Sequence, residues 1–327
     1  MGSVMLRLLE ERKFPLEELR LFASERSAGR TMATGFGDIV VEQVDRADLS
    51  GMDIALCSMG ATASRSFAPA IAAAGAVVVD NSSAWRMDPD VPLVVPEVNS
   101  HALAELPKGV VANPNCTTMV CMAPLAALRD AAGLERVVAS TYQAVSGAGR
   151  AGVTELTGQV AKAGAEASQL AFDGQAVDLG QPDKFPEPIA YNVVPLAGKL
   201  VDFETDEEHK FRDETRKILE LATLGVSCTC VRVPVYTGHS VSLNVQLGRP
   251  LDVPEATEVL AGAPGVVLAD VPTPLRAAGR DPSYVGRIRR DTSVEAGLSL
   301  FVSGDNLRKG AALNAIQIAE ALISGAK

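Results

Sequence analysis

The residue best suited to do chemistry is a cysteine in the segment 113–118, which reads Asn-Pro-Asn-Cys-Thr-Thr. The short β-branched stretch 109–112 before it predicts a buried strand, and the stretch 119–128, rich in Ala, Leu and Met, predicts a helix. Cys116 is therefore expected on the first turn of a helix, where unpaired N–H groups and the helix dipole favour a thiolate. A cysteine so placed can act as a nucleophile near neutral pH. A buried cysteine that only fills space is the alternative.

The other cysteines suggest reduced thiols with structural roles. Cys57 lies in an apolar stretch and is expected in the core, and Cys121 cannot share a helix face with Cys116. Cys228 and Cys230 share one face of an expected strand and could begin a metal site. Because no second Cys or His pair with ligand spacing follows, we predict no metal.

Bulk composition bounds the class of protein. A chain of 327 residues can form two domains with real cores. Although 47% of the residues are hydrophobic, the longest apolar run, 67–79, is too short to span a bilayer. A net charge of −10 without a basic stripe argues against nucleic acid as a partner. Since no charged-then-apolar leader is present, we expect a soluble, cytoplasmic protein.

The order of expected elements indicates an α/β fold. In the first part, strands at 19–23, 38–44, 53–57, 77–80 and 110–111 are joined to helices at 2–12 and 60–74. Short connections between them are typical of a Rossmann-like, doubly wound parallel sheet. Such a sheet usually opens with a strand and a glycine-rich turn. Here both are missing, and the chain opens on the helix.

From residue 136 the pattern changes to a second, α+β domain with a mixed sheet. Strands are expected at 137–146, 228–235, 240–247, 284–290 and 298–303, and helices at 151–172, 206–221 and 308–323, the last packing back on the first domain. We therefore predict a dinucleotide-binding domain, 1–115 plus 306–327, and a catalytic and dimerisation domain, 116–305.

Four motifs in this order and separation resemble those of the aspartate-semialdehyde dehydrogenase family. They are Asn-Pro-Asn-Cys at 113–116, Gln-Ala-Val-Ser-Gly-Ala-Gly at 143–149, Arg-Val-Pro-Val and Gly-His-Ser within 232–240, and Gly-Asp-Asn-Leu-Arg-Lys-Gly at 304–310. The resemblance covers essentially the whole chain. It implies a homodimeric enzyme that converts L-aspartyl 4-phosphate and NADPH to L-aspartate 4-semialdehyde, phosphate and NADP⁺. That reaction serves lysine, diaminopimelate, methionine and threonine biosynthesis.

By resemblance, Cys116 is the acyl-thioester nucleophile, His239 is the acid/base, and Gln143 positions the substrate beside the sulfur. A neutral amide can hydrogen-bond a substrate without protonating a thiolate. Of the three histidines, His239 alone lies in a Gly-His-Ser turn between strands, and an unperturbed imidazole pKa suits proton transfer near neutral pH. A histidine in a surface turn is the alternative.

The resemblance also assigns charged residues to the substrate. Arg232 in a strand interior is costly unless it meets an anion, and the family uses it to clamp the substrate carboxylate. Glu207 matches the acid that contacts the substrate amine, whereas Arg86 and Lys210, assisted by Asn115, match the phosphate-binding residues. For Glu207 and Lys210 a solvated helical ion pair is the alternative.

The cofactor positions implied by the resemblance are Gly2, Ser24, Arg26, Ser27, Ala28, Ser146, Gly147 and Asn306. Arg26 after the expected strand favours the 2′-phosphate of NADP, although Glu25 beside it is acidic. The stretch 35–37, Gly-Phe-Gly, precedes a strand and is expected to be a turn rather than a phosphate loop. Since Gly2 matches the last glycine of the family's loop, we hypothesise that the gene start was placed late.

Three other functions remain open at this stage. N-acetyl-glutamyl-phosphate reductase shares the thioester chemistry and an Asn-x-x-Cys element, but Gln143, Glu207 and Lys210 favour the aspartyl enzyme. Glyceraldehyde-3-phosphate dehydrogenase carries its cysteine in a different local motif. The missing loop also allows a cofactor-impaired fragment or a non-catalytic dimer partner.

Overall fold

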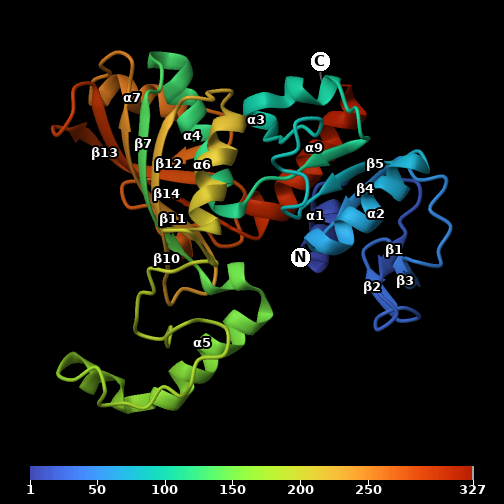
Figure 1. Cartoon of the computed structure of the whole chain (residues 1–327), viewed down its shortest axis with the longest axis horizontal. Helices are drawn as coiled ribbons and strands as arrows, with labels where there is room; N and C mark the ends of the chain where they lie inside the picture. The colour runs from blue at the N-terminus through green and yellow to red at the C-terminus, as the bar shows by residue number, and fades with distance from the viewer. Residues whose placement is uncertain (326–327) are drawn as a thin grey trace. The chain divides into compact units, whose positions relative to one another are not determined.

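The computed structural model describes residues 1–325 and contains two compact units (Figure 1). One comprises Met1–Pro114 together with the C-terminal segment from Ala311, and the other comprises Asn115–Gly310. The sequence predicted boundaries at 115/116 and 305/306. Assignment of cofactor binding to one unit and catalysis to the other stays a prediction.

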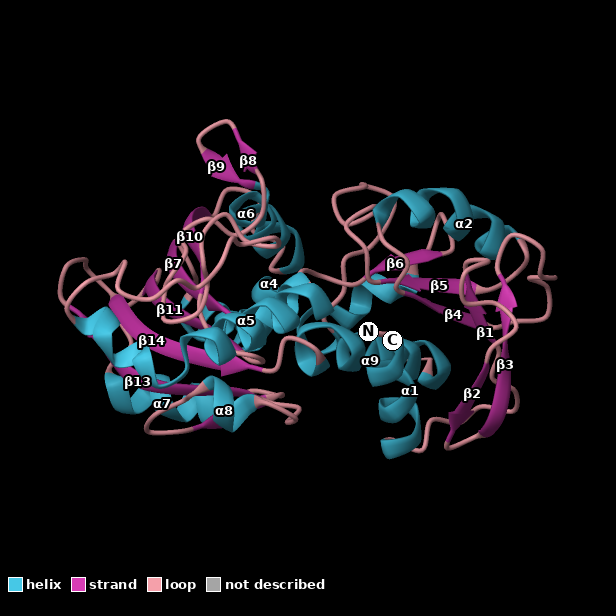
Figure 2. Cartoon of the chain, turned by 90° about the horizontal axis from the view of Figure 1, so that it is seen from below, coloured by secondary structure: helices cyan, strands magenta, loops and turns pink. Residues whose placement is uncertain are grey.

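The first unit contains a parallel sheet covered by helices on both faces. Its strands are β4 (Ile54–Cys57), β5 (Val77–Asp80) and β6 (Val110–Ala112), in that spatial order. Figure 2 shows α2 (Ala61–Ala73) on one side of these strands and α9 (Leu313–Ser324) with α1 (Gly2–Glu11) on the other. The core between sheet and helices includes Leu8, Val79, Val111 and Ile316. The Rossmann-like α/β arrangement and the return of the last helix to this unit are therefore confirmed.

A second small sheet in this unit has the order β1-β3-β2, with β1 (Leu21–Ala23) parallel to β3 (Gly37–Gln43). Strand β2 (Thr31–Thr34) pairs antiparallel with β3 through a tight turn that begins at Gly35. The expected turn at 35–37 is confirmed, but β2 was not predicted, because residues 31–34 were assigned to no element. The described strands thus divide this α/β unit into two separate sheets.

The second unit is built on one mixed sheet with the strand order β10-β7-β11-β14-β13-β12. The strands are β7 (Arg136–Gln143), β10 (Gly225–Arg232), β11 (His239–Gln246), β12 (Val266–Leu268), β13 (Ser283–Asp291) and β14 (Gly297–Gly304). Helices α4 (Cys116–Ala132), α6 (Asp206–Ile218) and α7 (Val253–Ala261) pack on it. The predicted mixed sheet is confirmed, whereas β12 and α7 were missed.

One helix differs from its prediction. The expected helix 151–172 is α5 (Arg150–Ala163), followed by a 3-10 segment, Gly164–Ala171. The α-helix ends here because Gly164 adopts a φ of +49°, which glycine tolerates and which interrupts the helical hydrogen bonds. Shorter elements are α3 (Pro96–Asn99), α8 (Pro274–Ala277), β8 (Leu200–Val201) and β9 (Glu204–Thr205). No helix within residues 1–325 is both long enough and apolar enough to cross a membrane.

Candidate active site

Four strands of the large sheet start or stop at one end of the sheet, and three of them carry functional residues there. Strands β7 and β10 are parallel neighbours that end at Gln143 and Arg232, which are paired in register. Strand β11 runs antiparallel to β7 and begins at His239, and β14 ends beside it at Gly304. Residues separated widely in the sequence therefore meet where these four strands start or stop.

Cys116 is the first residue of α4, as the sequence predicted. The helix is capped by Asn115, whose Oδ1 accepts hydrogen bonds from the backbone N–H groups of Thr117 at 2.9 Å and Thr118 at 3.4 Å. The Cys116 side chain is partly exposed, whereas Cys121 on the same helix is fully buried. A sulfur at a helix N-terminus that substrate can reach is stabilised as a thiolate and is suited to nucleophilic attack.

His239 faces Cys116, with 3.2 Å between its Nε2 and the cysteine Sγ. Its Nδ1 accepts a hydrogen bond of 3.0 Å from the backbone N–H of Ala144. The imidazole is fully buried, so the reading of a surface-turn histidine is wrong. The expected titration near neutral pH is wrong as well, because burial, and then the positive charge of Arg232, lowers the pKa of His239 well below its usual range.

Gln143 and Arg232 border the same space. Gln143 Nε2 donates to Thr117 Oγ1 and, at 3.3 Å, to Glu207 Oε2. Its Oε1 is buried without a hydrogen-bond partner among the described residues, so it remains available as an acceptor. Arg232 is nearly buried and donates through Nη1 to the carbonyl oxygen of Ala144 at 3.1 Å. That contact leaves the guanidinium further donors for an anion.

Glu207 and Lys210 form an ion pair of 2.8 Å on α6, and Lys210 also contacts Asp206 at 2.8 Å. Burial alone would raise the pKa of Glu207, but Lys210, with smaller contributions from Arg232 and Gln143, lowers it overall. Glu207 is thus an ionised acid beside Gln143. The predicted phosphate contact of Lys210 stays a prediction, since in this structure its ammonium is paired with two carboxylates.

Removing the lysine should make the stability depend on pH in a defined direction. Lys210→Met is expected to cost roughly 1–3 kcal/mol near neutral pH, because Glu207 then stays partly buried without its main counter-charge. The pair's contribution is full above about pH 5, where the unfolded carboxyl is ionised, and fades as pH falls through the lowered pKa of folded Glu207. The difference between wild type and variant should therefore shrink as the pH is lowered.

Urea unfolding at a series of pH values measures this difference. Lys162→Met, which breaks an exposed pair with Asp178, is the matched control and should change stability little at any pH. A Lys210→Met cost that is independent of pH would contradict the assignment of Glu207 as the titrating partner.

Two residues that sequence reasoning missed help to hold this geometry. The buried Glu214 accepts a hydrogen bond of 2.6 Å from the backbone N–H of Asn115. Glu207 accepts one of 3.1 Å from the side-chain Nδ2 of Asn115. Because Glu207 and Glu214 lie about two helical turns apart, they share one face of α6. That spacing was the available signal for Glu214. Thr117, which accepts from Gln143, was detectable only as a polar residue in the first turn of α4.

The predicted cofactor residues of this unit lie beside His239. Asn306 accepts the N–H of Gly238 at 2.8 Å through Oδ1 and donates to Ser146 Oγ at 2.9 Å through Nδ2. An added Cβ at Gly147 would meet Arg232 Nη1 at 2.7 Å and the His239 ring at 3.1 Å, so a side chain there would displace Arg232 or His239. Asn306 thus ties together the two turns that carry Gly147 and His239.

In the first unit, Arg86 is buried and donates to the carbonyl oxygens of Asn113, at 2.9 Å, and Asn81, at 3.0 Å. Ser24, Arg26, Ser27 and Ala28 follow β1, as predicted, and Gly2 begins α1. Arg26 is exposed and forms no ion pair within residues 1–325. Its guanidinium is therefore available to an anion.

The remaining cysteines carry no visible chemistry. Burial raises the pKa of the Cys57 thiol to about 12, consistent with the expected core role. Cys228 and Cys230 lie side by side with 3.7 Å between their sulfur atoms, as expected for one strand face. In the part of the chain that the structure describes, no group of His, Cys, Asp or Glu is arranged to hold a metal ion.

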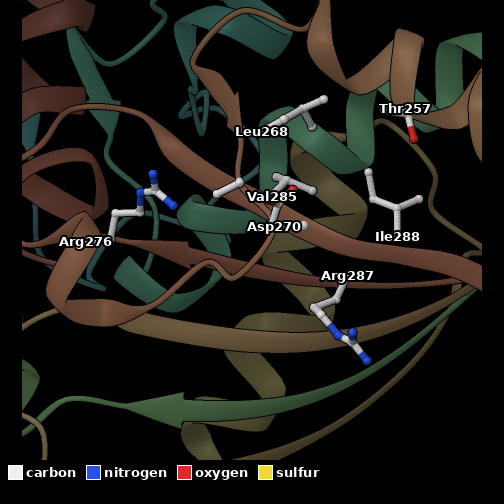
Figure 3. A pocket seen from close by; sticks show the side chains of 9 residues that line it. Thr257, Leu268, Asp270, Arg276, Val285, Arg287 and Ile288 are labelled. Atoms are coloured by element: carbon white, nitrogen blue, oxygen red, sulfur yellow. The ribbon is translucent and has the colours of Figure 1, made fainter.

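A cavity of about 480 Å³ elsewhere in this unit, along β12 and β13, contains none of the residues above. Its lining includes Arg276, Asp270, Arg287 and Ile288 (Figure 3). The two arginine side chains point in opposite directions in this view, so they do not converge on one anion. The candidate site is therefore the end of the large sheet around Cys116.

Family models match both parts of the chain. Residues 1–106 match the NAD binding domain of semialdehyde dehydrogenases, and residues 125–309 match their dimerisation domain. Aspartate-semialdehyde dehydrogenase of Streptomyces akiyoshiensis is 59% identical, over 98% of this chain and 94% of the relative. The chain belongs to the aspartate-semialdehyde dehydrogenase family. The resemblance of the four motifs is thereby confirmed, and the chain is an oxidoreductase of amino-acid biosynthesis that acts on a small molecule.

Other members of the family agree with this assignment. The enzyme of Corynebacterium glutamicum is 56% identical, over 98% of this chain and 96% of its own length. Among solved structures, aspartate semialdehyde dehydrogenase II of Vibrio cholerae complexed with ASA superposes with a TM-score of 0.92 at 42% identity, covering 100% of this chain and 96% of that one. The Rossmann-like unit and the mixed-sheet unit are thus those of the family.

Proposed function

We propose that this chain catalyses the NADP-dependent, phosphorylating oxidation of L-aspartate 4-semialdehyde and its reverse, the reduction of L-aspartyl 4-phosphate. The reaction would serve lysine, diaminopimelate, methionine and threonine biosynthesis in the cytoplasm. One observation carries the proposal: a helix-terminal Cys116 lies 3.2 Å from the His239 Nε2. Arg232 and His239 both contact the main chain of Ala144, and Glu207 contacts Asn115, the residue before Cys116. That arrangement suits thioester chemistry on a zwitterionic substrate.

The proposed roles follow from the contacts. Cys116 attacks the acyl phosphate and holds the substrate as a thioester after phosphate leaves. His239 Nε2 is close enough to Sγ to contact an oxygen on the carbon that the sulfur bonds. Gln143 presents the free Oε1 acceptor and the fixed amide that orient the acyl group. A bound reduced nicotinamide would supply the hydride that converts the thioester to the aldehyde.

The charges beside Cys116 support an amino-acid substrate. Arg232 retains donors for an α-carboxylate, and the ionised Glu207 suits an α-ammonium group. N-acetyl-glutamyl phosphate has no ammonium group, so the Glu207 charge would face a neutral amide. This difference favours the aspartyl substrate over the N-acetylated rival.

The proposed phosphate contacts rest on Lys210, Asn115 and Arg86. Lys210 could exchange a carboxylate partner for phosphate, because Asp206, one of its two partners, is partly exposed. Asn115 uses Oδ1 for the helix cap and Nδ2 for Glu207, so its assistance would require Nδ2 to turn to the anion. Arg86 donates to the carbonyl oxygens of Asn113 and Asn81, so a contact with phosphate would require its guanidinium to exchange a partner.

NADP is proposed over NAD because of Arg26. Its exposed guanidinium lies just after β1, the position at which dinucleotide-binding sheets recognise the ribose, and it has no carboxylate partner among the described residues. Ser24, Ser27 and Ala28 surround it in the same turn. Gly2, Ser146, Gly147 and Asn306 are the other proposed cofactor contacts, and Arg26 with the two serines suits the 2′-phosphate.

A homodimer is also part of the proposal. Strand β7 exposes Ser140 and Tyr142 on one face of the sheet, and Tyr142 packs against Phe301 with 5.7 Å between ring centroids. An open, partly apolar sheet face in the region that matches a dimerisation domain is suited to pairing with a second copy. Sedimentation of the purified chain tests this, and a monomer at micromolar concentration would contradict it.

The deciding assay is oxidation of aspartate semialdehyde with NADP, run with and without phosphate. We expect turnover that depends on phosphate, is weaker with NAD, and is weaker with N-acetyl-glutamate semialdehyde. Preference for the N-acetylated aldehyde would favour the reductase instead. Absence of turnover and of a Cys116 acyl adduct by mass spectrometry would favour a non-catalytic partner.

A further inference from the structure

The main chain of Ala144 contacts both side chains that border Cys116. Its N–H donates to His239 Nδ1 at 3.0 Å, and its carbonyl oxygen accepts from Arg232 Nη1 at 3.1 Å. Ala144 is fully buried and directly follows the last residue of β7. One peptide segment without a functional side chain therefore touches two groups of the candidate site.

An amide N–H can only donate a hydrogen bond, so His239 Nδ1 must present a lone pair to it. The neutral ring then carries its proton on Nε2, the atom that faces Cys116. We infer that Ala144 fixes His239 as the Nε2–H tautomer, so that the ring donates a hydrogen bond at Cys116 and does not accept the thiol proton. This inference deepens the proposed function and rests on it for its catalytic meaning.

The surroundings oppose a second proton on the ring. A proton on Nδ1 would set two N–H groups against each other in a fully buried place. Arg232 on β10 adds a positive charge. The Cys116 thiolate, which faces the ring from α4, is an anion, but the single proton on Nε2 already donates to it without a second proton on the ring. Glu207 on α6 is engaged by Lys210, and Asp305 after β14 accepts backbone N–H groups, so neither stabilises an imidazolium.

Asn306 acts as a positioning residue for this arrangement. Its Oδ1 holds the N–H of Gly238, next to His239, and its Nδ2 holds Ser146, two residues after Ala144. The Asn306 side chain thus holds the turn after Ala144 close to the start of β11, where His239 lies. This role is additional to the proposed contact of Asn306 with the cofactor.

A donor is sufficient for the proposed reaction. Cys116 first loses its proton to solvent, and attack by the thiolate sulfur then forms the C–S bond and moves the carbonyl π electrons onto oxygen. When these electrons return to form the carbonyl group again, the bond to phosphate breaks. Phosphate leaves with the electron pair of that bond and takes its proton from water. Hydride addition places charge on the same oxygen, and its return breaks the C–S bond and restores the thiolate. His239 can stabilise each oxyanion through Nε2–H without a change in its own protonation.

Histidine-selective ¹⁵N NMR on the full chain tests the inference. The chain has three histidines, and His239→Asn assigns the signal. Between about pH 6 and about pH 8.5, His239 should show one protonated nitrogen, Nε2, and one bare nitrogen. A proton on Nδ1, or an imidazolium at neutral pH, would overturn the inference.

Ala144→Pro removes the N–H, and its φ of −62° already suits proline. We expect the pKa of His239 to rise by at least about one unit in this variant, or its two tautomers to mix. Asn306→Ala should do the same more weakly and serves if the proline variant fails to fold. Unchanged His239 spectra in a folded variant would show that Ala144 does not fix the tautomer. Because no substrate is present, this readout is independent of whether phosphate-dependent turnover is found.

Discussion

Cys116→Ser is expected to abolish phosphate-dependent oxidation of aspartate semialdehyde, with kcat falling on the order of 10⁴-fold or more. A serine hydroxyl at the start of α4 would keep the helix and the hydrogen bond to His239. It cannot form a comparable anion, however, because the neutral imidazole, with Nδ1 occupied by Ala144, is a poor base for a hydroxyl. Thermal unfolding should be nearly unchanged, which separates the chemical loss from a folding defect.

A second cysteine provides the matched control. Cys228→Ser changes a half-buried thiol of the same unit and should leave kcat within about twofold, since such substitutions away from the site act mainly on stability. Mass spectrometry after incubation with aspartyl phosphate should find an acyl adduct on Cys116 in the wild type and none in Cys116→Ser. Turnover by the serine variant close to that of wild type would remove Cys116 from the mechanism.

Local patterns were sufficient to place the elements that carry the site. The strand at 110–112 and the start of α4 at Cys116 followed from β-branched and helix-forming runs on either side of a polar turn. The strands that end at Gln143 and Arg232 were long enough to be detected by composition. Their meeting at one edge depends on strand order, β10-β7-β11, which no local pattern encodes.

The features that sequence could not supply are those made by tertiary contacts. The burial that lowers the pKa of His239 arises from packing of β11 in the sheet. The Gly-His-Ser pattern alone therefore predicted a histidine with an ordinary pKa. Glu214 looks like one more charge on a charged helix until its contact with the Asn115 N–H is seen. Ala144 acts through its backbone alone, and a backbone group is the same at every position in the sequence.

Arg232→Lys is expected to raise KM for aspartate semialdehyde by roughly 10- to 100-fold, while kcat falls less. The guanidinium holds the Ala144 carbonyl with Nη1 and still offers a planar pair of donors to a carboxylate. Lysine retains the charge but has one nitrogen, which cannot serve both partners in that geometry. The pKa of His239 should stay low, because burial and a neighbouring cation both persist.

A truncated substrate distinguishes carboxylate binding from a general disturbance of the site. 3-Aminopropanal is aspartate semialdehyde without its carboxylate, so wild type and Arg232→Lys should use it equally poorly. Arg249→Lys, an exposed arginine paired with Glu255, is the control and should leave both substrates unaffected. If Arg232→Lys impaired both aldehydes alike, the arginine would act through the Ala144 turn rather than on the substrate. Equal loss would thus reassign Arg232 from substrate recognition to the positioning of His239, because Ala144 accepts from Arg232 through its carbonyl oxygen and donates to His239 through its N–H.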